Sequence, residues 1–140
     1  MLRAFPMILI AVAAYNALIY GGLGLGHDAA FMLGQSVTVP VFSGDAWKVS
    51  VGDGLVTLSL LLLFVETINS ARISHRAIPG HILSTLTFVG AVTEFITLKG
   101  FGTSPFFLIT AMCLFDVVAG YTIAIIAARR DVTLAPPDGG

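Results

Sequence analysis

The chain has 140 residues, of which 56% are hydrophobic and only 11% are charged. A typical soluble domain is about 25% charged, so a soluble fold of this composition would lack polar groups to cover its surface. The formal net charge of −1 argues against nucleic-acid binding, which needs a basic face to neutralise phosphates. The apolar residues also cluster in long blocks, the pattern of membrane-spanning helices. Composition therefore predicts a small integral membrane protein.

Four apolar blocks are each long enough, at a rise of about 1.5 Å per residue, to cross a bilayer as a helix. We expect spans at about 5–22, 54–70, 81–98 and 105–128, forming one all-α domain over 1–128. We interpret the first block as a retained helix, because no small-x-small cleavage site closes it. The tail, 129–140, is expected to lie in the cytoplasm and to be disordered.

The connection between the first and second spans contains two β-rich runs. Residues 37–42 and 46–51 flank the turn Ser43-Gly44-Asp45, an arrangement typical of a short hairpin. Pro40 cannot donate to a strand ladder, so it must lie at an edge. We therefore expect a short β-hairpin in this outer loop.

Basic residues predict the orientation of the chain. If four spans start from a cytoplasmic N-terminus, every arginine falls on the cytoplasmic side and both lysines fall outside, which agrees with the enrichment of Lys and Arg in cytoplasmic loops. The arginines are Arg3, Arg72, Arg76, Arg129 and Arg130, and the lysines are Lys48 and Lys99. The residues expected to anchor the chain at the two membrane interfaces are Trp47, Arg72, Arg76, Arg129 and Arg130.

Several segments carry a family resemblance. Residues 43–53, 62–66 and 115–121, with the closing Ala-Arg-Arg-Asp of 128–131, resemble a family of small four-span bacterial inner-membrane proteins that has no assigned activity. The resemblance implies a multi-pass protein of the bacterial inner membrane. It implies nothing about chemistry.

Three carboxylates fall inside the expected spans, namely Glu66, Glu94 and Asp116. Ionisable groups within a membrane are costly and face protein or water, which makes each a functional candidate. The helical rise places Glu66 and Asp116 at a similar depth and Glu94 nearer the outer face. They could form a stepwise path for protons or cations. The alternative is that they are interhelical hydrogen-bond partners, a role also expected for Tyr15, Asn16 and Tyr20.

Small residues on the same helices predict where helices approach closely. In the fourth span, Gly120 and Ala124 continue a row of four-residue steps from Asp116, and in the third span Gly90 lies near Glu94. Glycine and alanine at such positions let helix backbones pack tightly in membranes. We therefore expect Gly90, Gly120 and Ala124 to be helix-packing residues.

No motif indicates an enzyme, a metal site or a cofactor. His27, His75 and His81 do not have a zinc-ligand spacing, and they do not face one another within spans as haem ligands would. Cys113 is the single cysteine, so no internal disulfide can form. No nucleotide-binding loop or nucleophile motif occurs in the sequence.

Two functional hypotheses follow. The first is a non-catalytic accessory or scaffold subunit of a larger membrane complex, whose partners are membrane lipids and other membrane subunits or further copies of the chain. The second is a small oligomeric proton- or ion-coupled transporter or channel that uses Glu66, Glu94 and Asp116. Small size and the lack of a ligand motif favour the first.

Overall fold

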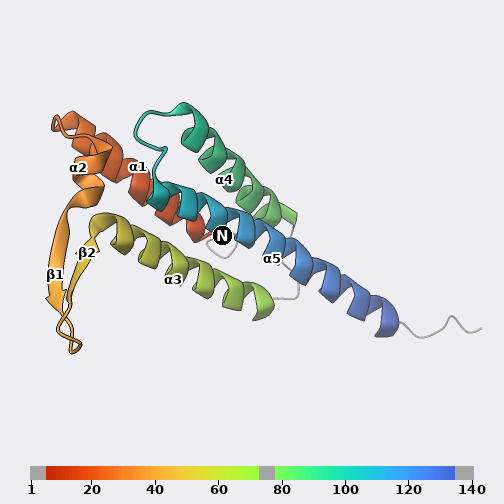
Figure 1. Cartoon of the computed structure of the whole chain (residues 1–140). Coiled ribbons are helices and arrows are strands. Elements are labelled where there is room, and N and C mark those ends of the chain that lie inside the picture. The colour runs from red at the N-terminus through yellow and green to blue at the C-terminus, as the bar shows by residue number, and fades with distance from the viewer. Residues whose placement is uncertain (1–5, 73–77, 135–140) are drawn as a thin grey trace, which may run out of the picture.

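The computed structural model describes residues 6–72 and 78–134. This part of the chain is mostly helical and carries one two-stranded antiparallel sheet (Figure 1), which confirms the fold class at that level. In chain order the elements are α1 (Ile8–Gly24), α2 (Ala29–Gly34), β1 (Ser36–Pro40), β2 (Ala46–Ser50), α3 (Val51–Arg72), α4 (Ile78–Thr97) and α5 (Ser104–Leu134).

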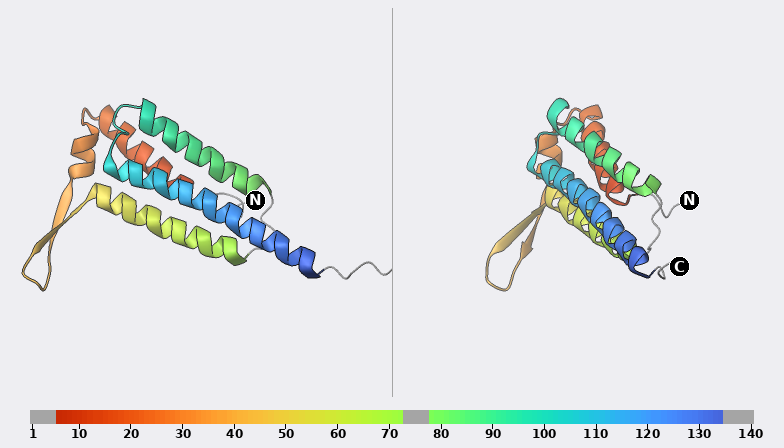
Figure 2. Two further views of the ribbon diagram at one scale, coloured as in Figure 1. Left: turned by 45° about the vertical axis from the view of Figure 1, so that its right-hand side comes forward. Right: turned by 90° about the vertical axis from the view of Figure 1, so that its right-hand side faces the viewer.

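The four long helices correspond to the four apolar blocks and lie side by side as a bundle (Figure 2). α5 packs against α3 and α4, and α1 packs against α3 and α5. α2, the hairpin and the turn from α4 to α5 lie at one end of the bundle, and the ends of α3 and α5 lie at the other (Figure 1). The helices therefore alternate in direction along the chain.

α5 is longer than the sequence predicts. It continues through Arg129 and Arg130 to Leu134, whereas the predicted helix ends at residue 128. The prediction of disorder is wrong for 129–134, because this stretch contains no glycine or proline and nothing in it interrupts a helix before Pro136. The rest of that predicted tail, 135–140, lies outside the described residues.

The hairpin between α1 and α3 confirms the predicted pair of strands around the Ser43-Gly44-Asp45 turn. Val39 pairs with Trp47 and Pro40 with Ala46, so Pro40 takes the last position of its strand. Gly44 in the turn has φ +91°, a conformation that glycine adopts without steric cost.

The short helix α2 lies in the connection between the first two predicted spans, where the sequence analysis predicts no helix. Asp28 caps its N-terminus by accepting a 2.7 Å hydrogen bond from the N–H of Phe31. An aspartate in front of an apolar run is a helix-start signal that the sequence contained. With only Ala29–Gly34 in the helix, the apolar pattern is too short to reveal it.

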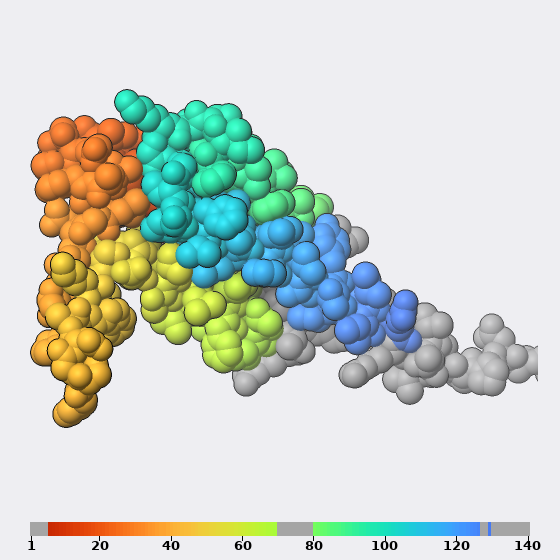
Figure 3. Space-filling view, viewed as in Figure 1, coloured from red at the N-terminus to blue at the C-terminus, as the bar shows by residue number. Residues whose placement is uncertain are grey.

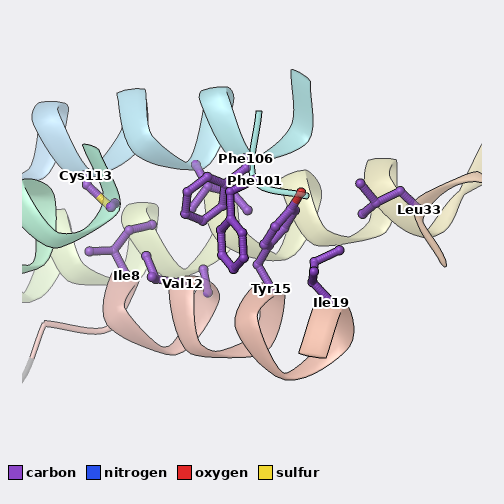
Figure 4. Close-up of a cluster of buried hydrophobic side chains, with 11 residues drawn as sticks. Ile8, Val12, Tyr15, Ile19, Leu33, Phe101, Phe106 and Cys113 are labelled. Atoms are coloured by element: carbon purple, nitrogen blue, oxygen red, sulfur yellow. The ribbon is translucent and has the colours of Figure 1, made fainter. Parts of the chain in front are cut away.

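The interior of the bundle is built on aromatic rings. Tyr15 of α1 packs against Phe101 and Phe106, with ring centroids 5.4 and 4.5 Å away (Figure 4). Phe101 and Phe106 meet edge to face at 5.0 Å. All three side chains are fully buried, so this cluster fixes α1 against the turn that leads into α5.

Two of the described helices are long and apolar enough to cross a membrane, in the ranges Val51–Asn69 and Ser104–Ile126. Only 17% and 28% of the most apolar stretches of these two helices are buried within the protein, whereas the core helix of a soluble protein would be mostly buried. α1 is apolar but shorter, at 17 residues. α4 carries many hydroxyl side chains and does not reach the same hydropathy.

Candidate functional site

The Glu66 side chain, from α3, lies at the N-terminus of α1. It is 1% exposed, and its Oε2 accepts a 3.2 Å hydrogen bond from the backbone N–H of Ile8. The first N–H groups of a helix have no partner within the helix and carry partial positive charge. The N-cap residue Met7 offers no side-chain hydrogen bond there. Glu66 of α3 therefore caps the N-terminus of α1 in trans.

Asp116 of α5 lies near the same level. Its side chain is 5% exposed. Asp116 is about one turn along α5 from Cys113, and Figure 4 places Cys113 across from Ile8, whose N–H bonds to Glu66. The structure thus brings two of the three predicted carboxylates together near the beginning of α1.

Glu94 occupies a separate position, between α4 and α1. Its Oε2 accepts a 2.9 Å hydrogen bond from Nδ2 of Asn16, which also donates to the carbonyl of Val12 at 3.1 Å. Ile8 and Asn16 are about 12 Å apart along α1. Glu94 is therefore too distant to bond directly to the Glu66 side chain.

The stretch between these two levels is packed with apolar groups. Ala11 and Val12 of α1, and Phe106 and Ile109 of α5, are all buried there. Buried hydroxyls of the bundle donate their protons to their own helices. Such bonds run from Ser59 to Leu55, from Thr87 to Leu83 and from Thr110 to Phe106, at 2.6–2.9 Å. Apolar side chains and hydroxyls bonded to their own helices therefore lie between the level of Glu66 and that of Glu94.

Tyr15 makes a further polar link across the bundle. Its hydroxyl donates to the carbonyl of Gly100 at 3.1 Å and lies 2.6 Å from Oγ1 of Thr103. Gly100 has φ +93° in the turn after α4. Asn16 is thus an interhelical partner, as the sequence predicts, whereas Tyr15 bonds to the turn between α4 and α5. Tyr20, for which the sequence predicts the same role, is half-exposed.

Gly120 lies at a close contact between α5 and α4. A Cβ atom added there would lie 2.9 Å from Nδ1 of His81, closer than packed side chains allow. The His81 ring also stacks on Tyr121, with centroids 5.3 Å apart. Ala124, one turn further along α5, is half-buried. The predicted row on α5 therefore faces the interior of the bundle.

Gly90 does not pack against another described helix of this chain. Gly90 is exposed, and a Cβ atom added to it would meet nothing within 4 Å. The inward face of α4 instead follows Ser84, Thr87 and Ala91, all of which are buried. Gly90 is one residue away from that row, which is about 100° around a helix. A close contact that the sequence reading missed is Gly52, where a Cβ would lie 2.9 Å from Cγ of Pro105.

The predicted interface anchors lie at both ends of the bundle. Trp47 is exposed on the hairpin, at the same end as Lys48 and Lys99. Arg72 ends α3, and Arg129 and Arg130 belong to the last turns of α5, at the opposite end (Figure 1). Arg3, Arg76 and His75 lie outside the described residues.

Comparison with known proteins gives no match. No family model, no curated protein and no solved structure matches this chain. Within residues 6–72 and 78–134, no three His, Cys, Asp or Glu side chains are grouped so that they could hold a metal ion.

His27 lies in the loop after α1, where its ring stacks on that of Phe31, with centroids 4.2 Å apart.

Proposed function

We propose that this chain is a four-span protein of the bacterial inner membrane with both termini in the cytoplasm. Large apolar side chains face outward on all four long helices, for example Ile10 on α1, Phe64 on α3, Leu86 on α4 and Phe115 on α5. A lipid environment removes the cost of exposing them to water. The described arginines, Arg72, Arg129 and Arg130, lie at the opposite end of the bundle from the two lysines, which supports the orientation.

Within that membrane location, we propose a non-catalytic accessory or scaffold subunit of a larger complex. The observation that carries this proposal is the bond between Glu66 and the N–H of Ile8. The second such bond joins Glu94 to Asn16. Each carboxylate connects two helices and so has a structural use that needs no transported ion.

A proton- or ion-coupled transporter is the second candidate. It is favoured by one observation, the burial of Glu66 and Asp116 in the same part of the interior, near Ile8 and Cys113. Two carboxyls at one depth can share a proton. The apolar packing between this pair and Glu94 counts against a path across the whole bundle.

Two measurements separate these functions. The purified chain in liposomes is expected to leave a pH gradient intact, and the chain extracted from its own membrane in mild detergent is expected to migrate at the mass of a defined multi-subunit complex. Asp116→Asn, which cannot titrate, and Asp116→Leu, which cannot hydrogen-bond, are the matched variants. Proton flux that Asp116→Asn abolishes in a stable protein would establish the transporter and refute the scaffold.

Topology is tested with single cysteines in a Cys113→Ser background. Asp45→Cys in the hairpin turn should react with a membrane-impermeant thiol reagent on intact cells. Ser74→Cys, in the connection before the third span, should react only after the cells are opened. The reverse pattern would invert the proposed orientation, and labelling of both would contradict the span count.

A further inference from the structure

The β1–β2 hairpin projects sideways from the bundle. In the views of Figures 1 and 2 it runs across the direction of the helices and extends beyond the side of α3. Figure 3 shows it standing apart from the mass of the four long helices. An isolated two-stranded hairpin is marginal in water, so this element needs a surface that supports it.

The pairing register gives the hairpin two different faces. Val37 pairs with Val49 and Val39 with Trp47, so these four side chains share one face. The other face carries Thr38 opposite Lys48, with small or polar residues at the remaining pairs. The apolar face is open, since Trp47 is 59% exposed and Val37 is 70% exposed.

The base of the hairpin lies where the apolar helix begins. β2 ends at Ser50, α3 begins at Val51, and the candidate membrane span Val51–Asn69 starts at that same residue. A hairpin that leaves this level across the helix direction runs along the membrane surface. If it ran parallel to the helices, it would project into water instead. The base of the hairpin therefore lies at the level at which the apolar surface of α3 begins.

We infer that the hairpin lies flat in the lipid headgroup layer, with the Val37, Val39, Trp47 and Val49 face against the upper acyl chains and Lys48 toward water. This inference rests on the proposed membrane location. Tryptophan favours the headgroup level because its ring is apolar and its indole N–H is polar. Phe42, fully exposed near the hairpin turn, adds an apolar contact at the far end.

Backbone chemistry explains why the hairpin stays in the headgroup layer and does not enter the hydrocarbon. Each of the two strands has an outer edge whose N–H and C=O groups have no strand partner in the described sheet. Open sheet edges are not tolerated in hydrocarbon, where no water can bond them. The headgroup layer offers water and phosphate to the edges and acyl chains to the apolar face.

Trp47 is the only tryptophan of the chain, so its fluorescence reports on this face directly. The probe is the purified protein in vesicles of phosphatidylethanolamine and phosphatidylglycerol, with or without bromine on the upper acyl-chain carbons. We expect a blue-shifted emission, loss of most of its intensity in brominated vesicles, and little quenching by aqueous acrylamide. The matched control moves the tryptophan to the other face, as Trp47→Phe with Lys48→Trp, and should show strong acrylamide quenching and weak bromine quenching.

A second variant separates this inference from the membrane location on which it rests. Trp47→Phe with Phe64→Trp places the reporter on the outward face of α3, where Phe64 is 62% exposed. Bromine quenching of this reporter together with a water-exposed Trp47 would overturn the hairpin inference and leave the membrane location standing. If bromine quenches neither the tryptophan at position 47 nor the one at position 64, both the hairpin inference and the membrane location would be overturned. Shielding of Trp47 that disappears at a low protein-to-lipid ratio would overturn the lipid assignment in favour of a second copy of the chain.

Discussion

Glu66 accepts a hydrogen bond from the backbone N–H of Ile8, although the two residues are 58 positions apart in the chain. A carboxylate from α3 thereby completes the N-terminus of α1, which lacks a side-chain cap of its own. The bond is buried, so the carboxylate and the N–H cannot exchange it for a bond to water.

The first prediction tests this trans cap. Glu66→Leu removes the acceptor and should lower the free energy of unfolding by about 1–3 kcal/mol, because the buried N–H loses its partner. Glu66→Gln keeps a carbonyl oxygen in place and should cost clearly less. Thermal unfolding in a mild detergent measures both. Equal losses for the two variants would show that the negative charge, and not the acceptor, is what α1 requires.

The second prediction concerns the bond between Asn16 and Glu94. A double-mutant cycle with Asn16→Ala, Glu94→Ala and the combined variant should give a coupling of about 0.5–1.5 kcal/mol, the range for side-chain hydrogen bonds between membrane helices. The same cycle with Asn16→Ala and Glu66→Gln should show almost none, since these sites are separate. Additive losses for Asn16 and Glu94 would mean that the bond does not contribute to stability.

The third prediction compares two helical glycines that the sequence alone treats alike. Gly120→Ala puts a Cβ against the His81 ring and should destabilise the bundle by about 1–3 kcal/mol through overpacking. Gly90→Ala meets nothing and should be neutral or slightly stabilising, since alanine favours helix. Thermal unfolding measures both. His81→Ala should relieve much of the Gly120→Ala loss; without that relief, the contact with His81 is not the cause.

The fourth prediction concerns the Tyr15 hydroxyl. Tyr15→Phe keeps the aromatic packing but removes the bonds to Gly100 and Thr103, so it should cost about 1–2 kcal/mol. Tyr20→Phe is the matched control on the same helix, and it should change stability little because Tyr20 is half-exposed. Protease cleavage near the α4–α5 turn should rise in Tyr15→Phe alone. Identical behaviour of the two variants would remove the hydroxyl from the account of how this turn is held.

The sequence by itself determined the local features of this protein. The four apolar blocks form the four long helices, because the backbone hydrogen bonds and the periodicity of a helix depend on residues that are near in the chain. The Ser43-Gly44-Asp45 turn between β-rich runs became a hairpin for the same reason. The charged residues from Arg129 onward predict an end of the last helix at residue 128, but charged residues are compatible with a helix, and α5 continues to Leu134.

Only the tertiary structure decided which partners the polar and small residues meet. Glycine spacing alone could not distinguish Gly120, which His81 covers, from Gly90, which nothing covers. Nor could the sequence reveal that the Glu66 carboxylate accepts a bond from the backbone N–H of Ile8. These outcomes depend on how each helix is rotated about its axis, and that rotation is set by the packing of side chains distant in the chain.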